Sequence, residues 1–177
     1  MFKPRIQRRH WLGCAIATGM TLMTGLHNSP AWALDAPQGR VILTVSGKIG
    51  QTNRDGKAVF DLAMLQKLPQ HTFTTQTPWE PKPVKFSGPL LKDVLAAVKA
   101  SGSQLTAVAL NDYKISLPVT DATQFGVMLA YRMNDEVLSV RTKGPLFVIY
   151  PFDSQAELKS AKFYERSIWQ LKAIDVQ

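Results

Sequence analysis

The chain has 177 residues, 45% of them hydrophobic, and a formal net charge of +8. Four of the 21 basic residues lie within the first 33 residues, where there is no acid, which leaves 17 basic residues against 13 acids in the remainder. Those 17 form no basic run and do not interleave with aromatic residues, so the composition argues against a nucleic-acid-binding protein.

Residues 1–33 have the features of a secretory signal peptide. A basic start is followed by an apolar run too short for a comfortable membrane span and by Ala31-Trp32-Ala33, the small-x-small pattern that signal peptidase accepts. Arg8 and Arg9 resemble a twin-arginine signal, so both the general secretory route and twin-arginine export remain open. We expect an exported single domain over residues 34–177.

The chemistry available to this domain is limited. Cys14 is the only cysteine and lies within the expected leader, so the domain would have no disulfide, thiolate nucleophile or sulfur ligand for a metal. His71 is the only histidine after the leader and has no thiol partner or acid pair nearby, which argues against a metal site or a hydrolytic triad. The residues that remain favour binding over catalysis.

In the first half of the domain, alternating hydrophobic residues predict four extended segments, at residues 41–46, 57–60, 71–77 and 84–87. Asp61 can cap a short helix that Pro69 stops. The proline-rich segment 78–83 predicts a shaped loop. Gly88-Pro89 should open the clearest helix, with Gly102 as its C-terminal cap.

In the second half, strands are predicted at residues 105–110, 113–117, 126–132, 146–150 and 167–176, with a helical turn at 120–124. The first two strands flank Asn111-Asp112 and form a hairpin. Segment 146–150 is apolar throughout and predicts a central strand buried on both faces, and Trp169 is expected in the core. Asp153 could cap a helix over 154–161. The pattern predicts an α+β domain with a mixed sheet and short helices.

Five segments, in this order, together resemble the sulfite-oxidase-type molybdopterin domain. The segments and the family patterns that they resemble are Phe86 to Leu95 (W-x-G-x-x-L-x-D-L-L), Leu110 to Pro118 (x-D-G-Y-x-x-x-I-P), Leu129 to Leu138 (L-A-Y-x-M-N-G-x-x-L), Lys143 to Pro151 (H-G-x-P-x-R-x-x-x-P) and Ser167 to Trp169 (K-W). Their order and spacing cover nearly the whole chain after the leader. The resemblance implies the sulfite-oxidase-type fold.

Two positions depart from that family. Its enzymes hold molybdenum through a cysteine a few residues before a tryptophan, and with Trp79 as the anchor this position is Thr75. A threonine hydroxyl does not replace a thiolate on a metal held by soft dithiolene sulfurs. An arginine of the family corresponds to Phe147, which weakens the case for a bound phosphate. The resemblance therefore implies that the pterin half of the site is kept while the metal and phosphate anchors are lost.

The run from Gly144 to Asp153 and the Trp-Gln-Leu sequence from Trp169 resemble periplasmic pterin-binding proteins built on this fold. This resemblance implies a non-catalytic periplasmic protein that binds a reduced pterin without molybdenum. It also implies a partner, the periplasmic domain of a membrane-bound diguanylate cyclase or phosphodiesterase of cyclic di-GMP. Two alternatives stay open: a molybdopterin-dependent oxidoreductase with an atypical metal site, and a ligand-free protein-interaction module.

A pterin is a flat bicycle that aromatic rings can sandwich, and a carboxylate can accept hydrogen bonds from its pyrimidine edge. Trp79 is the first stacking candidate, and ligand binding is expected to order the loop around it. Tyr131 and Tyr150 follow, although core packing competes for both. The full set of expected pterin-binding residues is Thr75, Trp79, Asp112, Tyr113, Tyr131, Arg132, Arg141, Tyr150 and Asp153.

Overall fold

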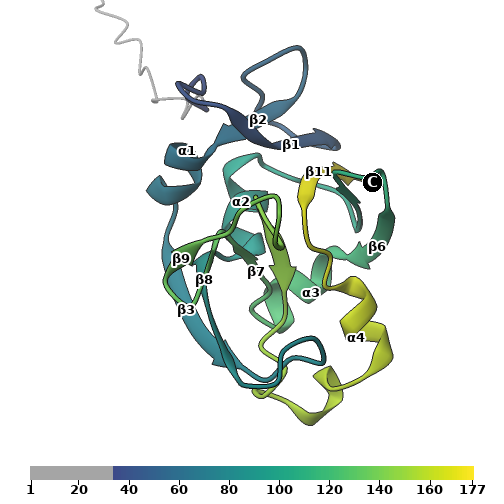
Figure 1. The fold of residues 1–177 in the computed structure, drawn as a ribbon. Coiled ribbons are helices and arrows are strands. Elements are labelled where there is room, and N and C mark those ends of the chain that lie inside the picture. Colours follow the sequence, from purple (N-terminus) through teal and green to yellow (C-terminus); the bar gives the residue numbers. More distant parts are fainter. Residues whose placement is uncertain (1–33) are drawn as a thin grey trace, which may run out of the picture. The chain divides into compact units, whose positions relative to one another are not determined.

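The structure, a computed structural model, describes residues 34–177 (Figure 1). The expected signal peptide and its cleavage site after Ala33 lie outside the described residues. Within residues 34–177 the chain forms a five-stranded, a four-stranded and a two-stranded sheet together with short helices, which confirms the predicted α+β class.

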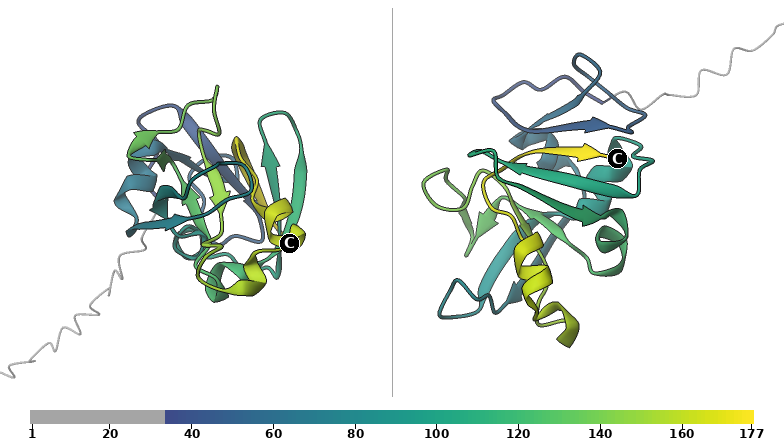
Figure 2. Two further views of the ribbon diagram at one scale, coloured as in Figure 1. Left: turned by 60° about the horizontal axis from the view of Figure 1, so that its bottom comes forward. Right: turned by 90° about the vertical axis from the view of Figure 1, so that its right-hand side faces the viewer.

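The five-stranded sheet has the order β2-β1-β11-β5-β6. Its strands are β1 (Val41–Gly47), β2 (Ala58–Asp61), β5 (Gln104–Ala109), β6 (Lys114–Pro118) and β11 (Leu171–Val176). The sheet is mixed, as predicted, because β1 pairs with β11 in parallel and the other neighbours are antiparallel. Leu43 and Val45 of β1 are fully buried, as their alternation with polar residues predicts. Figure 2 shows β11 lying between β1 and the β5–β6 hairpin.

The four-stranded sheet has the order β3-β4-β8-β9, with β3 (Gln70–Thr75), β4 (Val84–Pro89), β8 (Arg132–Met133) and β9 (Glu136–Val137). The third sheet pairs only β7 (Met128–Ala130) with β10 (Phe147–Ile149). The prediction of a central strand at 146–150 is therefore wrong in its position, although β10 is fully buried. Its second edge is covered by irregular chain, since the backbone N–H of Val148 donates to the carbonyl of Ile168 at 2.9 Å.

The helices are α1 (Leu62–Lys67), α2 (Leu91–Ala97), α3 (Val119–Gln124), α4 (Ala161–Arg166) and a 3-10 turn, η1 (Ala156–Leu158). Asp61 caps α1 as predicted, because its carboxylate accepts a hydrogen bond from the backbone N–H of Met64 at 2.8 Å. Within residues 34–177, no helix is long and apolar enough to cross a membrane.

Two helix boundaries differ from the prediction. Pro89 ends β4, and α2 begins only at Leu91. Gly102 is not the cap of α2: a Cβ there would lie 2.2 Å from the carbonyl oxygen of Gln177, so the glycine lets the C-terminal backbone pass. The predicted helix over 154–161 is also wrong, because η1 and α4 replace it.

Tyr150, one of the expected pterin-binding residues, lies in the core. Its side chain is fully buried, and its hydroxyl donates to the carboxylate of Asp121 at 2.7 Å. Arg166 donates to the same carboxylate at 2.7 Å. Burial and the neighbouring Asp121 carboxylate raise the pKa of the Tyr150 phenol. This polar group joins α3, α4 and the residue after β10 beneath the surface.

Candidate functional site

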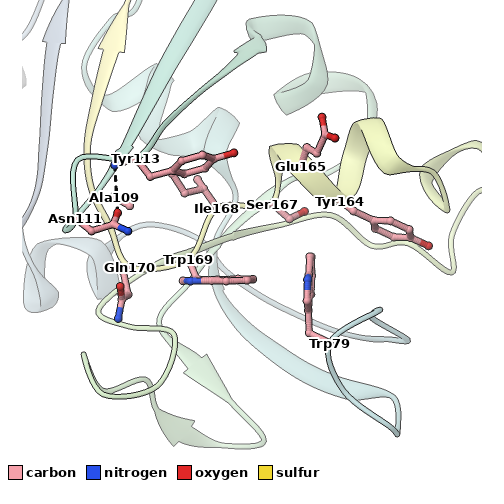
Figure 3. A pocket seen from close by; sticks show the side chains of 10 residues that line it. All are labelled: Trp79, Ala109, Asn111, Tyr113, Tyr164, Glu165, Ser167, Ile168, Trp169 and Gln170. Atoms are coloured by element: carbon pink, nitrogen blue, oxygen red, sulfur yellow. Dashed lines mark hydrogen bonds between the residues drawn. The ribbon is translucent and has the colours of Figure 1, made fainter.

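A pocket of about 440 Å³ opens where three segments meet: the tip of the β5–β6 hairpin, the chain from α4 to β11, and the loop between β3 and β4 (Figure 3). Its volume falls within the roughly 300–1,000 Å³ of small-molecule sites. The residues that line it are Trp79, Ala109, Asn111, Tyr113, Tyr164, Glu165, Ser167, Ile168, Trp169 and Gln170.

Aromatic side chains dominate this pocket. The rings of Trp79 and Trp169 meet edge to face, with centroids 5.6 Å apart and planes at 88°. Tyr164 packs against Trp79 at 6.2 Å, and Tyr113 projects from the hairpin on another side (Figure 3). Trp169 is 40% exposed and Tyr113 is 53% exposed, so both present ring surface that the protein itself does not cover. Such a lining suits a flat, largely apolar ligand.

Trp79 is held firmly by its loop. The side-chain amide of Gln76 donates to the carbonyl of Glu80 at 2.8 Å, and the Glu80 carboxylate pairs with Lys143. The indole also packs on Phe147 and Phe152, with ring centroids 5.8 and 6.2 Å away. The expectation that a ligand must order this loop is therefore not supported, because contacts within the protein already fix it.

Trp169 is exposed because the chain turns sharply just after it. Gln170 adopts a left-handed φ of 53°, its backbone N–H donates to the carbonyl of Lys143 at 3.0 Å, and its carbonyl accepts from Leu110 at 2.8 Å. Strand β11 starts only at Leu171, so Trp169 does not follow the strand alternation. The prediction that Trp169 lies in the core is wrong for this reason.

Thr75 and Asp153, two of the expected pterin-binding residues, contact each other and do not line this pocket. The Thr75 hydroxyl is buried, accepts from the backbone N–H of Asp153 at 3.0 Å, and lies 3.3 Å from the Asp153 carboxylate. That carboxylate also accepts from the backbone N–H of Gln76 at 2.6 Å and pairs with Lys159 at 2.7 Å. The hydrogen bond from Lys159, followed by that from Gln76, lowers the pKa of Asp153.

Asp112 points into solvent beside the pocket. Its side chain is 80% exposed and pairs with Lys172 at 2.6 Å, and this hydrogen bond lowers the pKa of Asp112. Its backbone φ of 66° shows the turn role that competes with binding for an aspartate at this position. Its neighbours Asn111 and Tyr113 line the pocket instead.

The remaining predicted residues also lie elsewhere. Tyr131 is buried, and its hydroxyl donates to Gln70 at 2.9 Å. Arg132 is on β8, where its guanidinium donates to the carbonyl of Asp135, and Arg141 is exposed and does not line the pocket. Of the nine predicted site residues, only Trp79 and Tyr113 thus line this pocket.

Sequence reasoning missed most of the wall formed by α4 and the chain after it. Tyr164 and Trp169 come from the two sides of a helix end, five residues apart, and no local periodicity marks them as partners. Glu165 reads as an ordinary exposed helix residue. The signal that was available is the closeness in sequence of two aromatic residues around a predicted helix end.

A family profile described as "oxidoreductase molybdopterin binding domain" matches residues 70–166, which is more than half of the chain. The chain belongs to the oxidoreductase molybdopterin binding domain family. The match spans β3 to α4 and so includes Trp79, Tyr113 and Tyr164 of the pocket. No curated protein matches the chain.

The pocket can be compared with the cofactor that the family name implies. Molybdopterin combines a flat pterin with a phosphate and with dithiolene sulfurs that hold molybdenum. No lysine or arginine lines the pocket, and Glu165 is its one charged residue, so a phosphate would meet no cation there. The lining offers aromatic rings to a flat heterocycle and no cation to a phosphate.

Phe147 explains part of this difference. It occupies the position where the resemblance to the family's enzymes places an arginine, and its buried ring packs under Trp79 and Trp169 with centroids 5.8 and 6.1 Å away. A cation in that place would be buried among aromatic rings. The phenylalanine instead completes the apolar base of the two tryptophans.

Proposed function

We propose that this family member is an exported, non-catalytic protein that binds a reduced pterin without molybdenum. We further propose that it regulates a membrane-bound enzyme of cyclic di-GMP metabolism in response to that ligand. The observation that carries the first part is the pocket of two tryptophans and two tyrosines that contains no cation. Stacking on these rings contributes about 0.5–1.5 kcal/mol for each aromatic pair beyond the burial of area.

The regulatory part is supported by the position of the pocket at an apolar surface. Tyr113 and Trp169 line the pocket and are exposed. Two further exposed apolar residues lie close by: Leu110 and Val140, which are 36% and 44% exposed, are each joined by a hydrogen bond to Gln170, which lines the pocket. A ligand on these rings would change the surface that a partner contacts, which is what a ligand-responsive regulator requires. The identity of the partner, a periplasmic domain of a diguanylate cyclase or phosphodiesterase, rests on the sequence resemblance alone.

The decisive experiment is mass spectrometry of small molecules that copurify with protein exported by its own leader, followed by calorimetric titration with tetrahydropterin. We expect a pterin in the purified protein and binding at micromolar concentration or below. Protein that carries no pterin and does not respond in the titration would contradict the proposal and favour a ligand-free interaction module. Capture of the membrane enzyme, with and without pterin, tests the coupling: equal capture in both states would contradict it.

A second candidate is a molybdopterin-dependent oxidoreductase, which membership of the family favours. Against it stand the hydroxyl of Thr75 at the position of the metal ligand and the absence of cations from the pocket lining. Elemental analysis of the exported protein separates the two candidates. We expect molybdenum well below one atom per chain, and a stoichiometric amount would establish the enzyme.

A further inference from the structure

We infer that the aromatic pocket also binds a small quaternary ammonium cation of the choline type, through cation–π contacts with the faces of its tryptophan and tyrosine rings. Such a cation is a second class of ligand for the rings that the proposed pterin would use, and its binding does not require that a pterin binds. Three features of the pocket point to it: the kinds of ring, the angles between them, and the charges around them.

The rings of the pocket are of the kinds that attract cations. All four aromatic side chains of the lining are tryptophan or tyrosine: Trp79, Tyr113, Tyr164 and Trp169. The quadrupole of such a ring attracts a cation that lies over its face within about 6 Å of the centroid, and tryptophan does so best. Within residues 34–177 the protein's own cation–π contacts involve the rings of Tyr131 and Phe163. No cation of the described chain thus competes for the ring faces of the pocket.

The rings meet at steep angles, which suits a rounded ligand. The planes of Trp79 and Trp169 lie at 88°, and those of Trp79 and Tyr164 lie at 75°. Figure 3 shows the ring of Trp169 with Trp79 standing beside it and Tyr113 on another side. A flat heterocycle can stack on only one of two perpendicular rings. A trimethylammonium group can touch two ring faces that meet in a corner.

The charges around the pocket also favour a cation. After the expected leader, 17 basic residues stand against 13 acids, yet no lysine or arginine lines this pocket. Glu165 is the one charged residue of the lining. Its carboxylate is exposed and points away from the rings in Figure 3, so it contributes a negative field rather than a contact. A cation on the rings therefore meets no like charge in the lining.

Both tryptophans are held in place before any ligand binds. Contacts within the protein fix the loop of Trp79, among them the packing of its indole on Phe147 with ring centroids 5.8 Å apart. The backbone of Gln170, bonded to neighbouring chain on both sides, anchors the turn that follows Trp169. Because neither ring has to be ordered by the ligand, a small cation loses little binding free energy to rearrangement of the site.

The test compares choline with 3,3-dimethylbutanol, which has the same shape but a carbon atom in place of the charged nitrogen. Both compounds are titrated calorimetrically into the whole exported protein, at fixed ionic strength and in a buffer free of amines. We expect wild type to bind choline about tenfold or more tightly than the neutral alcohol. Tetrahydropterin should displace choline, since both ligands use the same rings.

A graded series at Trp169 separates the effect of charge from that of apolar area. Trp169→Phe keeps a ring that attracts cations less strongly, and Trp169→Leu keeps an apolar side chain without a ring. The preference for choline over the neutral alcohol should fall from wild type to Trp169→Phe and again to Trp169→Leu. The matched control is Phe73→Leu, because Phe73 is a partly exposed ring that does not line the pocket, and it should keep the wild-type preference.

The results that would overturn the inference are distinct from those that bear on the pterin. A wild type that binds neither choline nor the neutral alcohol, or binds both equally, would show that the positive charge contributes nothing. An unchanged preference in Trp169→Leu, or choline that bound tetrahydropterin does not displace, would place the cation outside this pocket. Binding of choline without any binding of tetrahydropterin would contradict the proposed function and support the cation site. Trp169 is 40% exposed, so its variants should fold, and the comparison within wild type needs no variant.

Discussion

The hydroxyl of Thr75 accepts a hydrogen bond from the backbone N–H of Asp153 at 3.0 Å and lies 3.3 Å from the carboxylate of the same residue. These contacts join the end of β3 to the segment after β10, 78 residues further along the chain. The position that the family's enzymes are expected to use for a metal ligand is here a structural link between two segments beside the Trp79 loop.

Thr75→Val should therefore destabilise the protein by about 1 kcal/mol, because it leaves the partly buried N–H of Asp153 without its acceptor. Urea unfolding followed by circular dichroism measures this change. Thr74→Val is the matched control, since Thr74 lies on the same strand with an exposed side chain. Equal unfolding midpoints for the two variants would show that the hydroxyl of Thr75 contributes nothing to stability.

Acid should weaken the same link. The pKa of Asp153 is lowered in the folded protein from its ordinary 3.8, so the stabilisation is present above pH 3.8 and is lost as the pH falls through the folded value. Asp153→Asn should be less stable than wild type at pH 7 and should approach it below about pH 3. Urea midpoints from pH 7 to pH 2.5 measure the difference. A gap between the two proteins that stays constant over this range would contradict the role of the Asp153 charge.

Local sequence patterns correctly predicted the features that depend on interactions between residues close together in the sequence. The alternation around Leu43 and Val45 and the cap at Asp61 needed only neighbouring residues. The alternation of apolar residues wrongly placed Trp169 in the core. It could not reveal the left-handed turn at Gln170, where the backbone contacts Lys143, 27 residues earlier in the chain.

The site was predicted less well, because it too depends on contacts between residues far apart in the sequence. Trp79 was found because prolines frame it, whereas Asp153 looked like a ligand-binding acid. Its carboxylate is in fact occupied by the Gln76 backbone and Lys159, which come from distant and nearby chain respectively. No single-sequence pattern states which acids are already paired within the folded protein.

The ion pair between Glu80 and Lys143 should couple the Trp79 loop to the chain that supports Gln170. Its side chains are only 29% and 21% exposed, so a double-mutant cycle with Glu80→Gln and Lys143→Met should give a coupling of about 1 kcal/mol or more. The control cycle, Asp35→Asn with Lys67→Met, probes a pair that is 70% exposed on both sides and should give less than about 0.5 kcal/mol. Equal couplings would mean that the Glu80 pair does not hold the loop.

The two tryptophans should respond differently to truncation. Trp79 packs on four aromatic rings and is partly buried, so Trp79→Ala should cost about 3 kcal/mol of stability in addition to any loss of ligand. Trp169 is 40% exposed, so Trp169→Ala should cost only about 1 kcal/mol.

Affinity for tetrahydropterin should nevertheless fall about tenfold in Trp169→Ala, because the exposed indole of Trp169 offers a ligand more free stacking surface than the partly buried indole of Trp79. Val137→Ala is the control, since Val137 is 51% exposed and does not line the pocket. Thermal melting and calorimetric titration separate the two effects. If Trp169→Ala binds the pterin as wild type does, the ligand does not stack on Trp169, and the pocket would have to bind it through Tyr113, Tyr164 and the edge of Trp79 alone.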